Sequence, residues 1–398
     1  MYDAIVVGAR AAGSPTAMLL ARRGYRVLLV DRASFPSDTL STHYIHQPGI
    51  ARLERWGLLE RLAATGCPPV TAMTFDVGPF ALAAAPPPSD GVAEGYCPRR
   101  TVLDSLLLEA AAEAGAEVRT GHSVDALVFE DGAVVGIRSD GAEERARIVI
   151  GADGRNSYVA RAVQAPEYET RAGRTCAYYS YWGRAQGEGA ELYPRDGRMV
   201  ISGPTHDGLQ IVVAFWPREE FKRVRGDVEK SFLEAVALAP SLAERLSAGE
   251  RVDRFYGSAD LPFYYRKPYG PGWALVGDAG YHKDPITAQG ITDAFRYAEL
   301  LADALDAGFT GAEPPAAALA GYERRRNEET RGLYELTYEL ASLAPPPPEQ
   351  QALFGALREN TEEAGRFFGL IAGTVRPDEF FAPANIGRIM EGAPVPAA

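Results

Sequence analysis

A turn near the start of the chain contains residue types that bind phosphate. Residues 8–13, Gly-Ala-Arg-Ala-Ala-Gly, lie between the apolar run 4–7 and residues 14–23, whose apolar spacing is helical. Such a turn presents free backbone N–H groups and the positive end of a helix dipole, which together suit a pyrophosphate. Asp31 ends the next apolar run, 18 residues after Gly13, where a carboxylate can accept hydrogen bonds from a ribose diol. A structural turn can contain the same glycines, but the strand, helix, second strand and acid in register favour a nucleotide site.

Two later turns place acidic residues at the ends of apolar runs. Asp153 and Gly154 follow the run 148–150, and Gly277 and Asp278 follow the run 273–276. Ligands of open α/β sheets bind at the carboxyl ends of strands, so both turns are expected to face a ligand. A simple Asp-Gly turn is the alternative at residue 153. Residues 285–290 then open a helix whose amides suit an electron-rich ring, and Gly290 is expected where a Cβ would crowd that ring.

Titratable residues cluster beside these turns. His282, Lys283 and Asp284 precede Pro285, and His43 lies in the segment 41–44. Groups of these types can transfer protons at a reacting centre, although each alone is equally well explained as an exposed loop residue. No metal site is expected, because His43 and His46 alone among the five histidines have ligand-like spacing and no acidic residue supports them.

The surrounding pattern predicts the elements that position these residues. Buried strands are expected at 4–7, 26–30, 146–150 and 273–276, and helices at 14–23, 48–64, 101–114, 228–246, 286–307 and 316–343. Residues 175–215 are strand-like and dense in Tyr and Trp. Alternation there places Tyr179 and Tyr181 on one face and Tyr178 and Trp182 on the other. One face can therefore line an apolar pocket while most of the remaining rings form core.

Length and composition narrow the class of protein. The chain has 398 residues, enough for about two or three structural units, and 46% of them are hydrophobic. With 53 acidic against 41 basic residues, the net charge of −12 argues against nucleic acid or an anionic membrane as a partner. No apolar run approaches the roughly 20 residues that span a bilayer and no signal peptide is evident, which predicts a cytoplasmic protein without a transmembrane segment. The sequence favours neither a monomer nor a homodimer.

Together and in this order, the three motifs resemble those of the FAD-dependent oxidoreductases built like para-hydroxybenzoate hydroxylase, the class A flavoprotein monooxygenases. That group also contains geranylgeranyl reductases and flavin-dependent halogenases. The resemblance covers residues 1–60, 97–165 and 265–310. It implies that the first motif binds the ADP half of FAD, the second serves both FAD and NAD(P)H, and the third binds the ribityl and pyrophosphate portion. The cofactor-binding residues that it implies are Gly8, Arg10, Ala12, Gly13, Asp31, Arg32, Arg100, Asp153, Gly154, Gly277, Asp278, Pro285, Ala288, Gln289 and Gly290.

Two positions depart from the family pattern. Arg10 replaces the middle glycine of the first motif, and its guanidinium is expected to swing outward and add positive charge. Ala288 replaces the first glycine of the usual Gly-Gln-Gly. Neither change removes a ligand group, and Arg100 matches the arginine that begins the middle helix of the family, so FAD binding remains the prediction.

The resemblance implies an α/β fold whose Rossmann-like FAD-binding domain is built from the separated segments 1–75, 98–170 and 265–310. An inserted, aromatic-rich β-sheet substrate domain is expected at 76–97 and 171–264, and a C-terminal helical segment at 311–398. The chain has no second dinucleotide motif, so NAD(P)H is expected to bind only transiently. It also has no Cys-x-x-Cys pair, which disfavours a dithiol redox enzyme.

The implied activity is that of an NAD(P)H-dependent FAD monooxygenase. Reduced FAD would react with O2, and a C4a-hydroperoxyflavin would hydroxylate or epoxidise an organic small molecule of aromatic or polyketide-like type. The catalytic candidates are His43, His282, Lys283, Asp284 and Pro285. A reductase of C=C bonds is the alternative, although the aromatic–Pro signature of those substrate domains is not evident. A halogenase is less favoured because Trp-x-Trp-x-Ile-Pro is absent, and a non-catalytic flavin-binding protein is the non-enzymatic alternative.

Overall fold

The computed structural model describes residues 1–391, and its first large sheet has a parallel centre. The strand order is β19-β20-β10-β1-β2-β7, and all neighbours are parallel except β19 and β20. These strands are β1 (Tyr2–Val7), β2 (Val27–Asp31), β7 (Glu117–Thr120), β10 (Ala142–Gly151), β19 (Tyr269–Gly270) and β20 (Trp273–Leu275). The central strands are apolar because both faces of the sheet are covered. Segments from three distant parts of the sequence therefore form one Rossmann-like sheet.

The two faces of this sheet are covered differently. One face packs on the helices α1 (Gly13–Arg22), α4 (Arg100–Glu113) and α9 (Gly290–Thr310). The other face packs on the hairpin of β8 (Val124–Glu130) and β9 (Ala133–Ser139) and on the short helix α5 (Tyr158–Ala162). Alternate residues of β1 point into the two cores. A one-residue shift in its register would therefore exchange the two sets of side chains and spoil the packing on both faces of the sheet.

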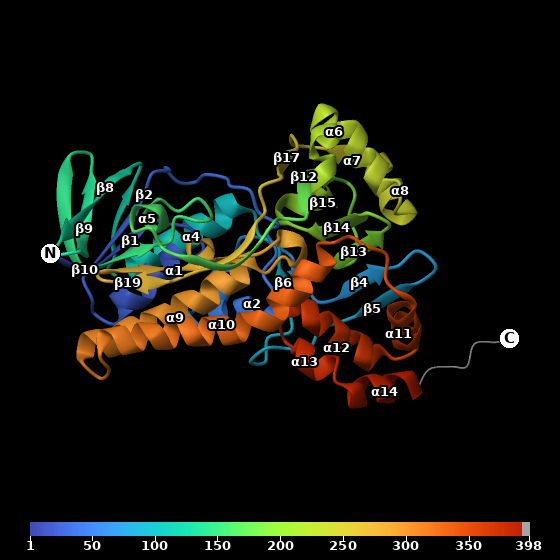
Figure 1. Cartoon of the computed structure of the whole chain (residues 1–398). Helices are drawn as coiled ribbons and strands as arrows, with labels where there is room; N and C mark the ends of the chain where they lie inside the picture. The colour runs from blue at the N-terminus through green and yellow to red at the C-terminus, as the bar shows by residue number, and fades with distance from the viewer. Residues whose placement is uncertain (392–398) are drawn as a thin grey trace.

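The second large sheet carries the aromatic residues. Its order is β16-β12-β15-β14-β13-β4-β5, with β17 paired to β12. The strands are β4 (Met73–Asp76), β5 (Ala81–Ala84), β12 (Thr175–Gly183), β13 (Ala190–Arg195), β14 (Arg198–Pro204), β15 (Gln210–Pro217), β16 (Glu250–Arg251) and β17 (Tyr256–Ser258). Its outer face is covered by α6 (Phe221–Gly226), α7 (Val228–Val236) and α8 (Pro240–Ala248), and its inner face joins the main core. Figure 1 shows the two large sheets toward opposite ends of the molecule.

Tyr179 and Tyr181 belong to the inner core, whereas Trp182 belongs to the outer one, against which Tyr178 also packs. The predicted alternation along this strand is therefore confirmed. The expected domain boundary at residue 75 falls inside β4, which pairs with β5 and with β13.

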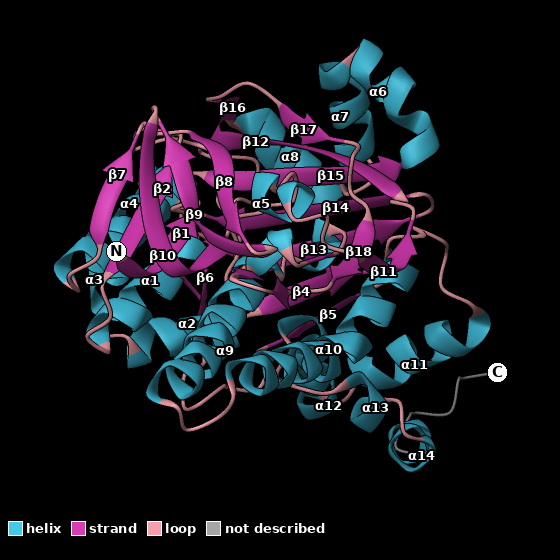
Figure 2. Ribbon diagram, turned by 60° about the vertical axis from the view of Figure 1, so that its left-hand side comes forward, coloured by secondary structure: helices cyan, strands magenta, loops and turns pink. Residues whose placement is uncertain are grey.

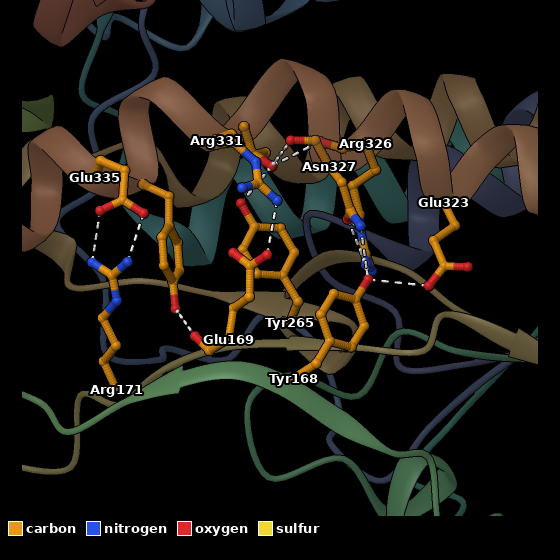
Figure 3. Close-up of polar contacts among 11 residues, drawn as sticks. Tyr168, Glu169, Arg171, Tyr265, Glu323, Arg326, Asn327, Arg331 and Glu335 are labelled. Atoms are coloured by element: carbon orange, nitrogen blue, oxygen red, sulfur yellow. Dashed lines mark hydrogen bonds and ion pairs between the residues drawn. The ribbon is translucent and has the colours of Figure 1, made fainter.

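A small sheet and a long helix connect the two large sheets. The sheet consists of β11 (Glu167–Arg171), β18 (Phe263–Arg266) and β21 (Tyr281–His282), and the helix is α10 (Pro315–Leu340). Figure 3 shows the polar contacts between them: Arg171 forms two hydrogen bonds to Glu335, at 2.6 and 2.7 Å, and Arg326 donates to the Tyr168 hydroxyl at 2.8 Å. Helix α10 therefore fixes the segment that leads into the turn at 277–290.

After α10, the described part of the chain continues as helices that pack beside the second sheet, and residues 392–398 of the expected C-terminal segment lie outside the described residues. These helices are α11 (Pro348–Arg358), α12 (Thr361–Ala372), α13 (Pro377–Phe380) and α14 (Pro383–Glu391). Figure 2 shows them, together with α9 and α10, on the side of the molecule opposite α6 and α7. Within residues 1–391, no helix is at once long enough and apolar enough to cross a membrane.

Two predicted helices are each broken into two. The segment 48–64 forms α2 (Gln47–Arg55) and α3 (Leu59–Ala64), separated at Gly57, which has a φ of 71°. The segment 228–246 forms α7 and α8, and Pro240 begins the second helix. Left-handed glycine ends a helix, and proline lacks the N–H that would continue the preceding one, so both breaks follow from local chemistry.

Candidate functional site

The turn between β1 and α1 is a close-packed glycine cradle. Gly8 has a φ of +103°, and a Cβ there would lie 2.5 Å from the Ala152 carbonyl oxygen. A Cβ on Gly13 would lie 1.7 Å from the Gly8 carbonyl oxygen. Within residues 1–391 the N–H groups of Ala11, Ala12 and Gly13 donate no backbone hydrogen bond. The turn therefore presents unpaired donors at a helix N-terminus, which is the requirement for a pyrophosphate.

The three predicted motifs meet at the carboxyl ends of adjacent strands. Val7 is level with Gly151 in the neighbouring strand β10, and Gly151 is level with Leu275 in β20. A Cβ on Gly277, whose φ is +63°, would lie 2.7 Å from the Ala12 Cβ, so the first and third motifs touch. The sheet thus assembles one site from residues that are far apart in the sequence.

Asp104 connects the two arginines of the predicted cofactor set. Its Oδ2 accepts a hydrogen bond from Arg10 Nη1 at 2.7 Å, and its Oδ1 accepts from Arg100 Nε and Nη2 at 3.0 and 2.9 Å. Arg10 also donates to the Ser37 carbonyl and hydroxyl. The Arg10 guanidinium therefore turns across to α4 and to the loop after β2, whereas the sequence led us to expect it to swing outward. Sequence reasoning did not single out Asp104, which is fully buried.

Asp31 is anchored at the end of β2 by backbone amides. Its Oδ2 accepts from Ala9 N–H at 2.7 Å, and its Oδ1 accepts from Ala33 N–H at 2.8 Å. A carboxylate has about four acceptor sites, so each oxygen keeps one for a ribose hydroxyl. Arg32 is exposed beside it.

Asp153 is turned toward its own helix. Its carboxylate accepts hydrogen bonds from the Ser157 hydroxyl at 2.5 Å and from the Tyr158 and Val159 N–H groups at 2.6 and 3.2 Å. Burial raises the pKa of Asp153, whereas these hydrogen bonds lower it. This carboxylate holds the start of α5 in place, which is the structural alternative considered for this turn. The adjacent Gly154 has a φ of +75° and leaves the backbone open at that point.

The turn before α9 contains an alanine in the left-handed backbone conformation, which glycine usually adopts. Ala288 has a φ of 53°, in the left-handed region, whereas Gly290 has an ordinary φ and a Cβ on it would meet no protein atom within 4 Å. The left-handed backbone conformation that favours glycine therefore lies at 288, and the backbone at 290 does not require glycine. The side chain of Gln289 turns away from the strand ends and donates a hydrogen bond to the Ile371 carbonyl in α12.

Asp284 is the buried carboxylate of this turn. It accepts from the Thr175 hydroxyl of β12 at 2.5 Å and from Ile286 N–H at 3.0 Å, which caps the turn that begins at Pro285. Burial raises the pKa of Asp284 to about 6, against the lowering effect of these two hydrogen bonds. Asp284 thus links the second sheet to the turn, and its pKa lies closer to neutral pH than that of an ordinary aspartate.

The two neighbouring candidates also have protein partners. Lys283 forms a buried ion pair with Asp293 of α9, and the Nδ1 of His282 is hydrogen bonded to the Pro262 carbonyl. Burial lowers the pKa of His282. These side chains fix β21 and α9 around the turn.

His43 lies on the inner face of the second sheet. Its Nδ1 is 2.8 Å from the Ser41 carbonyl oxygen, so Nδ1 must carry the proton, and its Nε2 then accepts from the Tyr181 hydroxyl at 2.8 Å. Burial and then the charge of Arg100 lower the pKa of His43 to about 3. The backbone φ of 64° is unusual for a non-glycine residue, so the surrounding contacts hold a strained position.

An apolar cavity of about 40 Å³ lies between the second sheet and the turn at 286–288. Its walls come from the segment 42–46, from the inner face of the sheet and from the end of α12. The lining residues are Thr42, Tyr44, His46, Met73, Cys97, Ala190, Leu192, Ile201, Ser202, Gly203, Ile211, Val213, Ile286, Thr287, Ala288 and Ile371. The predicted region thus contributes the cavity wall, but the aromatic residues singled out in β12 do not line it. The sequence drew attention to His46 only through its spacing from His43, which was weighed as a metal site, and Ile371 was missed because no local pattern marks it.

The residues present fit FAD. The glycine cradle and the unpaired amides suit the pyrophosphate, and Asp31 stands where a ribose would lie. Asp278 lies at the end of β20, and its carboxylate has no hydrogen-bond partner within residues 1–391, so it can accept from ribityl hydroxyls. No cluster of side chains in the same residues could hold a metal ion.

Two curated proteins are similar to this chain in sequence, one over nearly its whole length and one over part of it. The chain is 27% identical to digeranylgeranylglycerophospholipid reductase 1 of Methanopyrus kandleri, over 93% of this chain and 98% of that one. It is 39% identical to protein FixC of Escherichia coli strain K12 over 171 residues, which are 40% of this chain and 38% of FixC.

Solved structures agree with this fold. The myxobacterial chondrochloren halogenase CndH is 25% identical, with a TM-score of 0.78 over 100% of this chain and 98% of that one. PqsL, a probable FAD-dependent monooxygenase from Pseudomonas aeruginosa, is 24% identical, with a TM-score of 0.73 over 93% and 99% of the two chains. At this level of identity, the similarity to PqsL shows that the two chains have the same fold and shows nothing about activity.

A family model described as "FAD binding domain" matches residues 1–337, which include all three motifs and both large sheets. The chain belongs to this FAD binding domain family and is an FAD-dependent oxidoreductase.

Proposed function

We propose that the protein is an NAD(P)H-dependent FAD monooxygenase that inserts oxygen from O2 into an organic small molecule of aromatic or polyketide-like type. The observation that carries this proposal is the apolar cavity that the turn at 286–288 lines together with the inner face of the second sheet. FAD, when bound and reduced, supplies the oxygen-transfer chemistry. The chain supplies the position of the substrate and a site without bulk water.

The residues around the turn have separable roles in this proposal. Asp31, Asp278 and the amides of residues 11–13 bind the cofactor, and Arg10 and Arg100 hold the turn through Asp104. The N-terminus of α9 is the positive end of the helix dipole, and in this proposal it stabilises negative charge on the reduced flavin ring. His43, His282, Lys283, Asp284 and Pro285 remain the candidates for proton transfer, and Asp284 is favoured among them because its raised pKa allows it to exchange a proton near neutral pH.

A reductase of C=C bonds is the second candidate. The likeness to the Methanopyrus kandleri reductase over nearly the whole length of both chains favours it. The monooxygenase is placed first because the aromatic–Pro signature expected of the substrate domain of a prenyl reductase is not evident in the sequence. A halogenase is an outcome of the same experiment because CndH has the same fold.

The test is an isotope experiment on the purified, FAD-loaded protein. A substrate panel is incubated with NADH or NADPH under ¹⁸O2, with bromide and chloride present, and products are analysed by mass spectrometry. The proposal expects substrate-stimulated oxygen uptake and products that contain one ¹⁸O atom. Products that gain two hydrogens without ¹⁸O identify the reductase, and halogenated products identify the halogenase. FAD-loaded protein that oxidises neither NADH nor NADPH with any substrate refutes NAD(P)H as the electron donor.

A further inference from the structure

The segment 34–40, which follows β2, is tied to the rest of the protein through one side chain. Ala33 accepts a backbone hydrogen bond just before it, and Ser41 is hydrogen bonded to His43 just after it. Within the described residues, the segment itself forms no backbone–backbone hydrogen bond. Its hydrogen bonds to other parts of the described chain all come from Arg10. Alternate residues of the segment are exposed, so little else holds it in place.

The Arg10 guanidinium has partners on two sides. Its Nη1 donates to Asp104 Oδ2 at 2.7 Å and to the Ser37 carbonyl at 3.2 Å. Its Nη2 donates to the Ser37 hydroxyl at 2.9 Å and to the Asp38 carbonyl at 3.3 Å. The guanidinium also lies over the Phe35 ring, 5.3 Å from its centroid. One planar group therefore bridges α4 and the segment, which requires several donors in fixed directions and not only a charge.

Both supports of this bridge are rigid. Arg10 belongs to the close-packed glycine turn, and its own carbonyl accepts from Ser14 N–H at 3.0 Å. The Asp104 side chain is 0% exposed in α4 and accepts two hydrogen bonds from Arg100. The segment 34–40 is therefore the part that moves when the bridge opens.

The segment connects two parts of the candidate site. It begins shortly after Asp31, the proposed ribose ligand, and leads to His43 on the inner face of the second sheet. Arg10 holds its middle against the turn whose amides suit the pyrophosphate. We propose that Arg10 is a positioning residue that keeps the segment 34–40 closed beside this turn and thereby slows the release of FAD. The proposal depends on FAD binding and goes beyond the proposed function, because it holds for whichever reaction the FAD supports.

A direct charge contact with the pyrophosphate is the alternative role for Arg10. The two roles differ when FAD is removed, because a phosphate ligand has no effect on the apoprotein, whereas a clamp holds the segment with or without the cofactor. They also differ in chemistry. A lysine at this position keeps the positive charge and the pairing with Asp104, but it cannot bridge to Ser37 and Asp38 at the same time.

The test measures opening of the segment and release of FAD in the same variants. Arg10→Lys removes the fork and keeps the charge, and Ser37→Ala removes one acceptor without altering the turn. Opening is measured as the rate at which thermolysin cleaves before Leu40, which is 50% exposed, in the apoprotein and in the FAD-loaded protein. Mass spectrometry identifies the cleavage site. Release is measured from the recovery of free-flavin fluorescence after dilution.

Arg10→Lys is expected to raise the cleavage rate at least about tenfold, in the apoprotein and in the FAD-loaded protein, because charge-assisted hydrogen bonds are lost. FAD release should accelerate by a similar factor. Ser37→Ala should change both rates in the same direction by a smaller factor and leave the melting temperature unchanged. Two controls should match the wild type: Arg26→Lys, at an exposed arginine that lies over the Tyr2 ring, and Ser34→Ala, at an exposed serine of the same segment outside the contacts of Arg10.

Three results would overturn the proposal. An Arg10→Lys apoprotein that is cleaved as slowly as the wild type would show that the charge matters and the fork does not. Faster cleavage with unchanged FAD release would show that the segment does not retain the cofactor. A Ser37→Ala variant with both rates unchanged would remove the segment from the role of Arg10, and this comparison holds even if Arg10→Lys does not fold, which the melting temperature shows. The ¹⁸O experiment reports on the reaction, so its failure leaves this test unaffected.

Discussion

Asp104 shows how one buried carboxylate can compensate for an unusual residue in a phosphate-binding turn. Arg10 places a long cationic side chain where the family fingerprint has glycine, and Asp104 accepts its hydrogen bond at 2.7 Å. The same carboxylate accepts from Arg100. Two cations and one anion leave net positive charge beside the turn, which favours a pyrophosphate. The departure from the fingerprint is thus part of the charge balance of the site.

Asp31 gives the first prediction at the scale of single residues. Asp31→Ala is expected to weaken FAD binding by about 1.5–3 kcal/mol, because a charge-assisted hydrogen bond to the ribose is lost. Kd is measured by titrating the apoprotein with FAD and following flavin fluorescence. Asp3→Ala is the control. Asp3 also accepts a hydrogen bond from a backbone N–H, that of Arg26, but it lies near the amino end of β1, away from the carboxyl ends that form the candidate site. Equal affinity of the wild type for FMN and FAD would contradict the assignment of this turn to the ADP half.

Asp284 gives a prediction about pH. Its folded pKa of about 6 lies above the unfolded value of 3.8, so the folded state binds the proton more tightly. This contribution to stability is present below the unfolded pKa and is lost as pH rises from about 4 to 6. Relative to Asp284→Asn, the wild type should lose on the order of 2–3 kcal/mol across this interval. Urea unfolding of both proteins at several pH values measures the difference, and a constant difference would refute the raised pKa.

At the scale of elements, α10 acts as a brace for the turn that follows β20. Arg326, on α10, is 1% exposed and donates to the Gly280 carbonyl at 2.9 Å and to the Arg266 carbonyl at 3.1 Å. Gly280 lies two residues after Asp278. The helix therefore determines the path of the chain between Asp278, the proposed cofactor ligand, and β21. Figure 3 shows the contacts that the same helix makes with β11 and β18.

Arg326→Ala is expected to destabilise the protein by at least about 3 kcal/mol, because several buried acceptors lose their donor at once. FAD should be released at a lower temperature for the same reason. Thermal unfolding followed by flavin fluorescence measures both effects. Arg324→Ala, at an exposed position two residues earlier on the same helix, should change stability by no more than about 0.5 kcal/mol. Similar losses in both variants would show that α10 does not brace the turn through Arg326.

At the scale of the whole molecule, the cavity exists only where four regions of the chain meet. The segment 42–46, the inner face of the second sheet, the turn at 286–288 and the end of α12 each contribute lining residues. The hydrogen bond from Gln289 to the Ile371 carbonyl joins two of these regions. Helix α12 is therefore part of the cavity wall and does more than pack beside the second sheet.

Ile371→Ala tests this role of α12. The substitution should enlarge the cavity and cost about 2–5 kcal/mol of stability. It should also shift the relative affinity from phenol toward 2-naphthol, measured by flavin absorbance on the FAD-loaded protein. Leu353→Ala in α11 is the control, because Leu353 is equally buried in the same core but does not line the cavity. It should lower stability and leave the ratio of affinities unchanged; an unchanged ratio in Ile371→Ala would exclude α12 from the site.

The sequence by itself determined the features that depend on neighbouring residues. The apolar run before Gly8, the helix after Gly13 and the acid at Asp31 specify a nucleotide-binding unit, because strand, turn and helix preferences act over a few residues. The order of the three motifs identified the FAD-dependent family, and the alternation along β12 gave the correct faces for Tyr179 and Tyr181. These inferences needed no information about distant contacts.

The tertiary structure decided which distant residues meet. Asp104 beside Arg10, Thr175 beside Asp284, and Ile371 beside Gln289 are pairs that no local spacing reveals. The turn of Asp153 toward α5 and the contacts of Arg10 with the loop after β2 likewise depend on which donors and acceptors surround them. Contacts between residues far apart in the sequence are fixed by the packing of whole sheets and helices, and hydrogen-bond satisfaction can be counted only after that packing is known.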